Sequence, residues 1–162
     1  MDSPVKKMIV YIDGSEESVT AAQYGIVLAK TMQAELTALY VINTRALDDL
    51  VKSRIFLKSE EEEYSQDIEK DAERYLNHVK NLGLQKGITV NAVQKRGTPF
   101  LEIKAQIAAD NTDLLVIGEI SKIRSRRDES FNEAERAMRN VRCSVLIVKD
   151  EERVWSMYDA LV

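Results

Sequence analysis

Short apolar runs alternate along this chain with stretches in which apolar residues recur every three or four positions. The runs cover residues 8–12, 36–42, 88–93, 114–117 and 145–148. The first run is continuous rather than alternating, which is typical of a strand buried on both faces of a parallel sheet. The pattern therefore predicts five strands with helices between them.

Two helices are predicted in the first half of the chain. Ser15 is suited to cap a helix that runs to about Met32, since two glutamates follow it where carboxylates favour the helix dipole. An apolar stripe predicts a second helix from about Ser65 to Leu82. The acidic run Glu60–Glu63 is most simply the solvated start of that helix.

Two further helices are predicted downstream. Thr98 can cap the first of them, and Pro99 fits its first position because its missing N–H would be unpaired there. The second covers Glu133–Arg139, and Asn132 is placed to cap it. This alternation predicts an α/β fold, an open five-stranded parallel sheet with helices on both faces and right-handed crossovers.

The length of 162 residues fits one domain of this kind. We assign residues 1–149 to the α/β domain and residues 150–162 to a C-terminal extension. The extension is too apolar to lack a partner surface, so we expect it to take part in an interface. Its apolar residues are Val154, Trp155, Met157, Tyr158 and Leu161.

Composition and charge narrow the classes of function. The formal net charge of -4 argues against general nucleic-acid binding, which needs a surplus of lysine and arginine. The single cysteine, Cys143, fits a reducing compartment, and we interpret it as a buried packing residue. No stretch has the apolar length of a signal peptide or a membrane span. We therefore expect a cytoplasmic protein that binds neither nucleic acid nor membranes.

No residue pattern points to catalysis or to a metal site. The single histidine, His78, falls on the solvent side of its predicted helix. A histidine metal cluster is therefore excluded, and a catalytic triad has no evident nucleophile.

Several segments, taken in order, resemble the universal stress protein family. Residues 8–29, with Asp13-Gly14-Ser15 between strand and helix, look like the family's first strand and helix. Its second strand, the start of its third helix and its last two strands have counterparts at residues 35–41, 97–99, 113–118 and 143–148. The resemblance covers about residues 6–149 and implies a Rossmann-like sheet of strand order 3-2-1-4-5.

One loop distinguishes the ATP-binding members of that family. In them the fourth strand ends in Gly-x-x-Gly, and nine residues later Gly-Ser or Gly-Thr opens the fourth helix, so bare backbone approaches the phosphates. Here Gly118 keeps the first glycine, but Ser121 replaces the second and Phe131-Asn132 replace the final pair. The chain thus resembles the members that do not bind ATP, and we expect no cofactor.

The nucleotide site that the resemblance implies is altered but can be named residue by residue. It comprises Asp13, Val41, Gly118, Ser121, Phe131 and Asn132. Asp13 would face the crevice at the end of the first strand, or would instead cap the turn before the first helix. A basic loop would contact an anion or would simply be solvated, and its cations are Lys122, Arg124, Arg126 and Arg127.

The family resemblance implies a stress-response protein that acts as a dimeric binding or signalling module, without ATP turnover and not as an enzyme. The homodimer would form by antiparallel pairing of the fifth strands, whose residues are Ser144, Val145, Leu146, Ile147 and Val148. The alternative is a nucleotide-binding switch that holds ATP with Mg²⁺ and has weak ATPase activity. A third interpretation is another doubly wound protein, such as an electron-transfer flavoprotein subunit. GxGxxG and GxxxxGK[ST] are absent, which weakens dinucleotide and P-loop interpretations.

Overall fold

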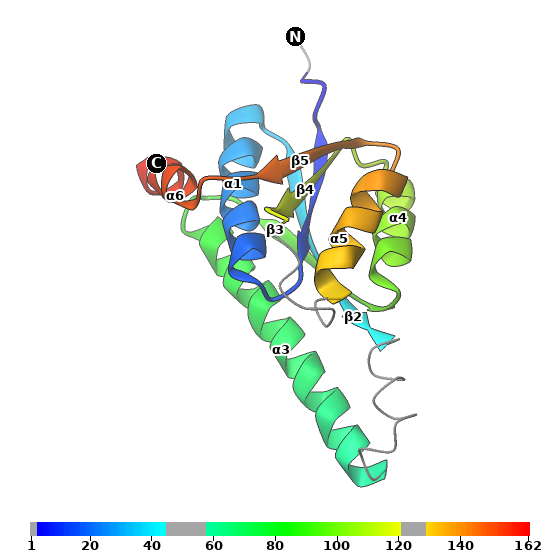
Figure 1. Cartoon of the computed structure of the whole chain (residues 1–162). Helices are drawn as coiled ribbons and strands as arrows, with labels where there is room; N and C mark the ends of the chain where they lie inside the picture. The colour runs from blue at the N-terminus through cyan, green and yellow to red at the C-terminus, as the bar shows by residue number, and fades with distance from the viewer. Residues whose placement is uncertain (1–2, 45–57, 121–128) are drawn as a thin grey trace.

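The structure, a computed structural model of the chain, describes residues 3–44, 58–120 and 129–162. One parallel sheet of order β3-β2-β1-β4-β5 forms its centre (Figure 1). The predicted α/β class and the strand order 3-2-1-4-5 are confirmed. The strands are β1 (Lys7–Ile12), β2 (Glu35–Asn43), β3 (Val90–Gly97), β4 (Leu114–Gly118) and β5 (Ser144–Val148).

Helices cover both faces of the sheet (Figure 1). On one face lie α1 (Glu16–Met32) and α3 (Lys58–Leu84), and on the other lie α4 (Pro99–Asp110) and α5 (Glu129–Asn140). The last helix, α6 (Glu151–Ala160), packs against α1 and lies beyond it as seen from the sheet. Within the described residues no helix has the length and apolar character needed to cross a membrane.

The continuous apolar run of β1 is explained by burial on both sides. Met8, Val10 and Ile12 enter the core formed with α1 and α3. Ile9 and Tyr11 enter the core formed with α4 and α5. Burial of each such side chain contributes about 1.5–3 kcal/mol, so both cores hold this central strand.

Three elements have other bounds than predicted. The helix predicted from Ser65 begins at Lys58, so the acidic run does lie at its start. The strand predicted over residues 88–93 spans Val90–Gly97, where it pairs with β2 although most of its side chains are exposed. The helix predicted from Glu133 begins at Glu129. A polar first turn or an exposed edge strand has no apolar periodicity, so the pattern could not locate these ends.

The C-terminal extension finds an apolar surface within its own chain. Val154 and Tyr158 are buried in the core shared with α1. The Tyr158 hydroxyl donates to the carbonyl oxygen of Leu82 at 2.7 Å, which ties α6 to the end of α3. Trp155 remains 48% exposed. Of the two aromatic residues expected at an interface, Trp155 is therefore the accessible one.

Candidate functional site

The strand order reverses between β1 and β4, and the candidate site lies at the carboxyl ends of these strands. Asp13 directly follows β1, and Gly118 ends β4, which pairs with β1 in parallel. Val41 lies on β2, one residue beyond the last paired level of Ile12 and Tyr40. The structure thus brings Asp13, Val41 and Gly118 to one edge of the sheet, where open α/β sheets bind ligands.

Asp13 holds the turn that starts α1. Its Oδ1 accepts hydrogen bonds from the Ser15 amide at 3.0 Å and from the Ser15 hydroxyl at 2.5 Å. Ser15 Oγ in turn accepts from the Ser18 amide at 3.1 Å, so Ser15 caps α1 as predicted. No described residue donates to Asp13 Oδ2. One carboxylate oxygen therefore serves the turn, and the other is available to a ligand.

Two tyrosines form an aromatic wall beside this turn. The rings of Tyr40 and Tyr75 stack with centroids 6.4 Å apart and planes 13° apart. A Cβ on Gly14 would lie 3.2 Å from the Tyr75 ring, and Gly14 has a φ of 84°, which favours glycine. Burial, and then the charge of Asp13, raises the pKa of Tyr40. The sequence placed Tyr75 only on the apolar stripe of α3, so this wall was not predicted.

Gly118 has a packing role of its own. A Cβ at this position would lie 2.6 Å from both the carbonyl carbon and the carbonyl oxygen of Glu17. Only a residue without a side chain lets β4 approach the first turn of α1 so closely. The glycine therefore does not by itself indicate a phosphate site.

The described surroundings of Gly118 are acidic. A cleft of about 110 Å³ lies between the starts of α1 and α6, beside the residue that follows Gly118. Its ionisable lining residues are one cation, Lys149, and five carboxylates, Glu16, Glu17, Glu119, Asp150 and Glu151. The negative charges of these five carboxylates would repel a polyphosphate bound in the cleft.

A buried carboxylate that the sequence did not reveal joins α4 to α5. Glu133 is 6% exposed, and its Oε2 accepts from the Phe100 amide at 3.1 Å. Thr98 occupies the N-cap position of α4 but makes no side-chain cap, so the predicted capping role belongs to Glu133 instead. The Arg136 guanidinium lies 3.6 Å from Glu133 Oε1 and 5.7 Å from the Phe100 ring centre.

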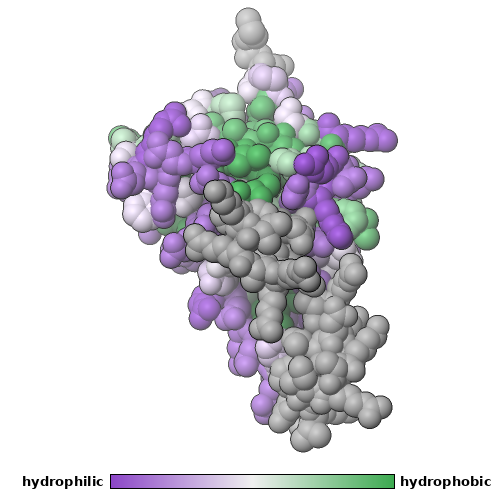
Figure 2. Space-filling model, in the orientation of Figure 1, coloured by the Kyte–Doolittle hydropathy of each residue, from purple (hydrophilic) through white to green (hydrophobic). Residues whose placement is uncertain are grey.

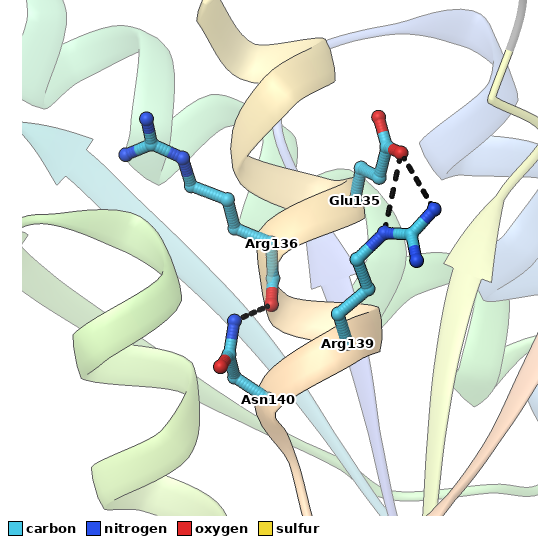
Figure 3. A network of polar contacts seen from close by, with 4 residues as sticks. All are labelled: Glu135, Arg136, Arg139 and Asn140. Carbon is cyan, nitrogen blue, oxygen red and sulfur yellow. Dashed lines mark hydrogen bonds and ion pairs between the residues drawn. The ribbon is translucent and has the colours of Figure 1, made fainter.

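Three other described polar residues of α5, Glu135, Arg139 and Asn140, form contacts along the helix (Figure 3). The Arg139 guanidinium lies 3.2 Å from the Glu135 carboxylate. The side-chain amide of Asn140 donates to the backbone carbonyl oxygen of Arg136 at 2.7 Å. The side chain of Arg136 points away from the pair of Glu135 and Arg139 (Figure 3). This leaves Arg136 free to face Phe100 on α4.

Part of the predicted site lies outside the described residues. Ser121 falls there, as does the basic loop with Lys122, Arg124, Arg126 and Arg127. The backbone of Phe131 and Asn132 lies in the first turn of α5, and the structure does not describe their side chains. Asn132 is therefore not the N-cap of α5, because the helix begins three residues before it.

The strand predicted to form a dimer lies at the edge of the sheet. Among the described strands β5 pairs only with β4, so its other edge is open. Figure 2 shows a hydrophobic surface where β5 lies in Figure 1, with hydrophilic groups on either side. Val145, Leu146 and Ile147 are half-buried, Ser144 is exposed and Val148 is buried.

The single histidine and the single cysteine of the chain are both accessible to different degrees. His78 is exposed on α3, as predicted. Cys143, which precedes β5, is half-buried rather than buried, because it lies at the margin of the core beneath α4 and α5. Burial raises the pKa of its thiol.

Comparisons with known proteins agree with this architecture. The chain is 28% identical over 148 residues to universal stress protein MJ0531 of Methanocaldococcus jannaschii, covering 91% of this chain and 84% of that protein. It is 30% identical over 118 residues to universal stress protein YxiE of Bacillus subtilis, covering 69% and 77%.

Solved structures share the fold at lower identity. The hypothetical protein MJ0577 has a TM-score of 0.70 at 20% identity, over 91% of this chain and 98% of that one. A universal stress protein in complex with cAMP has a TM-score of 0.67 at 20% identity, over 91% and 99%. The sequence model of the universal stress protein family matches residues 4–149. The chain therefore belongs to the universal stress protein family.

Proposed function

We propose that this chain is a stress-response binding or signalling module that works as a homodimer and does not turn over ATP. The acidic cleft beside Gly118 is the observation that carries the proposal, since a polyphosphate there would meet five carboxylates and one lysine. The sequence adds support, because Ser121 and the pair Phe131-Asn132 stand where ATP-binding members have glycines. Their side chains remove the bare backbone on which phosphate binding depends.

Calorimetric titration with ATP and Mg²⁺ tests the first half of this proposal. We expect no binding tighter than roughly 10 μM and no release of phosphate above the blank. The matched variant Ser121→Gly, Phe131→Gly, Asn132→Ser restores the family pattern and is expected to bind ATP more tightly than the native sequence. Tight binding by the native chain would overturn the proposal.

The homodimer is proposed from the open edge of β5. An unpaired edge with half-buried apolar side chains invites pairing with a second copy, and the hydrophobic surface in Figure 2 lies there. Light scattering should give twice the chain mass of 18.4 kDa. Val145→Lys, which sets two like charges across the seam, should give monomers. A native protein that stays monomeric at all concentrations would remove the dimer from the proposal.

The role of the extension is tested best by Trp155→Ala. Removal of the whole extension would uncover the face of α1 that Val154 and Tyr158 cover, so its effect on assembly would be ambiguous. Trp155 is exposed, and its substitution leaves that packing in place. A lower dimer affinity places α6 in the interface, whereas an unchanged affinity excludes it.

A nucleotide-binding switch with ATP, Mg²⁺ and weak ATPase activity is the second candidate. Asp13 Oδ2 is open to a ligand, and a structural neighbour of this chain is a universal stress protein in complex with cAMP. Asp13→Ala removes both the turn and the ligand contact, whereas Asp13→Asn keeps an acceptor for Ser15. Nucleotide binding that disappears in Asp13→Asn while the fold persists would favour this second candidate.

A further inference from the structure

A cavity lies at the end of the molecule opposite Asp13. It measures about 550 Å³ and is bounded by the C-terminal part of α4, the residues after α5 and the start of β5. All five strands are parallel, so their starts lie along one side of the sheet and their ends along the opposite side. The start of β5 is therefore far from the end of β1. The cavity is therefore separate from the crevice at Asp13 and Gly118, and its size is that of a small-molecule site.

The lining of this cavity combines apolar surface with positive charge. Ile107 and Val141 supply apolar contacts, while Lys104 and Arg142 supply two cations. Neither cation forms an ion pair or hydrogen bond in the part of the chain that the structure describes. None of the described residues that line the cavity carries a carboxylate, although the whole chain has a net charge of -4.

A buried hydroxyl in the same lining lacks a partner. Thr112 is 8% exposed, and its Oγ1 makes no hydrogen bond. Buried polar groups in native proteins are nearly always paired, since an unpaired one destabilises the fold. An unpaired hydroxyl beside two unpaired cations is the combination expected where a polar ligand group is missing.

We propose that this cavity binds a small organic anion with an apolar body, of the aryl carboxylate class. The carboxylate lies between Lys104 and Arg142. The Thr112 oxygen is shielded from solvent in this structure, and rotation of its side chain brings the hydroxyl to the carboxylate as a donor. The aryl body packs against Ile107 and Val141. The carbonyl ends of α4 and α5 also face this region, but their partial charges are smaller than the two full charges of the cations. This site is independent of whether the crevice holds a nucleotide.

Cys143 provides a direct measure of occupancy, because it lines the cavity and is the only cysteine of the chain. The experiment follows its reaction with the neutral reagent 4,4′-dithiodipyridine in the presence of increasing 2-naphthoate. We expect saturable protection of the thiol by 2-naphthoate, and protection about tenfold weaker by the neutral 2-naphthamide. Protection is a ratio of rates within one protein, so a changed thiol pKa in a variant cancels.

Variants then assign the contacts. Lys104→Gln and Arg142→Gln should each raise the half-protecting naphthoate concentration about threefold, and the double variant about tenfold. Lys80→Gln, an exposed lysine on α3 outside the cavity, is the matched control and should change nothing. Thr112→Val should weaken protection while leaving the fold intact.

Two results would overturn the proposal. The first is the absence of saturable protection up to about 10 mM 2-naphthoate. The second is equal protection in the native protein and in the double variant. This result would mean that the two cations only neutralise the partial negative charges at the carbonyl ends of α4 and α5. Circular dichroism of each variant confirms that any loss of protection occurs in a folded protein.

Discussion

Substituting alanine for Gly118 would place a single methyl group between β4 and α1. The added Cβ would lie 2.6 Å from the carbonyl carbon of Glu17 and 2.9 Å from its Cβ. Carbon atoms in ordinary contact are about 3.5–4.0 Å apart, so the first turn of α1 must move by about 1 Å. The neighbouring atoms belong mostly to backbone, so no side-chain rotation can relieve the contact.

The size of the effect follows from what holds α1 in place. Its buried side chains contact β1, and α6 packs against part of its other side, so a shift of α1 disturbs both sets of contacts. Overpacking of such a site destabilises by typically 1–3 kcal/mol, and the backbone contact favours the upper end. For a chain of this length, about 3 kcal/mol corresponds to a fall in Tm of about 6–12 °C.

Urea unfolding followed by the fluorescence of the single tryptophan, Trp155, measures this loss. Gly25→Ala is the matched control, since Gly25 is a buried residue within α1, but its added Cβ would meet a flexible Leu36 methyl at 3.3 Å. We expect Gly25→Ala to stay within about 1 kcal/mol of the native protein, because alanine also favours the helix. The packing explanation fails if Gly118→Ala unfolds within about 0.5 kcal/mol of the native protein.

Substitutions at three further positions test individual contacts by urea unfolding. Tyr158→Phe leaves the Leu82 carbonyl without its donor, so the free energy of unfolding should fall by about 1 kcal/mol; an unchanged value would mean that α6 is held by packing alone. Glu133→Ala removes the acceptor of the Phe100 amide and should lower the free energy of unfolding by about 1–2 kcal/mol, whereas Glu133→Gln, which keeps an amide oxygen, should lose less. Asp113 accepts hydrogen bonds from two backbone amides at the start of β1, which lowers its pKa. A folded-state pKa below the unfolded value stabilises the protein above the unfolded pKa. The advantage over Asp113→Asn should therefore be full near about pH 6, should begin to decline as pH falls below about 4, and should be lost once pH has passed through the folded-state pKa. An advantage that is constant over this pH range would contradict the assignment.

The elements that could be predicted from sequence are those set by residues only a few positions apart in the chain. The apolar run of β1 is continuous because its residues face two cores, and Ser15 caps α1 through atoms only three residues away. The exposed edge strand β3 has no such pattern, and its end was missed. Its pairing is decided by β2, which lies far away in the sequence.

The candidate site was less predictable because its contacts join distant segments. Glu133 accepts from the Phe100 amide 33 residues away, and a glutamate in an amphipathic helix gives no sign of this. The stacking of Tyr40 on Tyr75 likewise depends on how α3 crosses the end of β2. The acidic cleft combines three segments that are adjacent only in the folded chain.

The bond between Glu133 and the start of α4 also has a dynamic consequence. Its donor and acceptor belong to different helices, so the first turn of α4 cannot expose the Phe100 amide to solvent without separating from α5. We expect the Phe100 amide to exchange with solvent only when α4 and α5 separate locally, and hydrogen exchange at this amide would measure that opening. A displacement of the start of α5 would break this bond and leave the first turn of α4 without its acceptor.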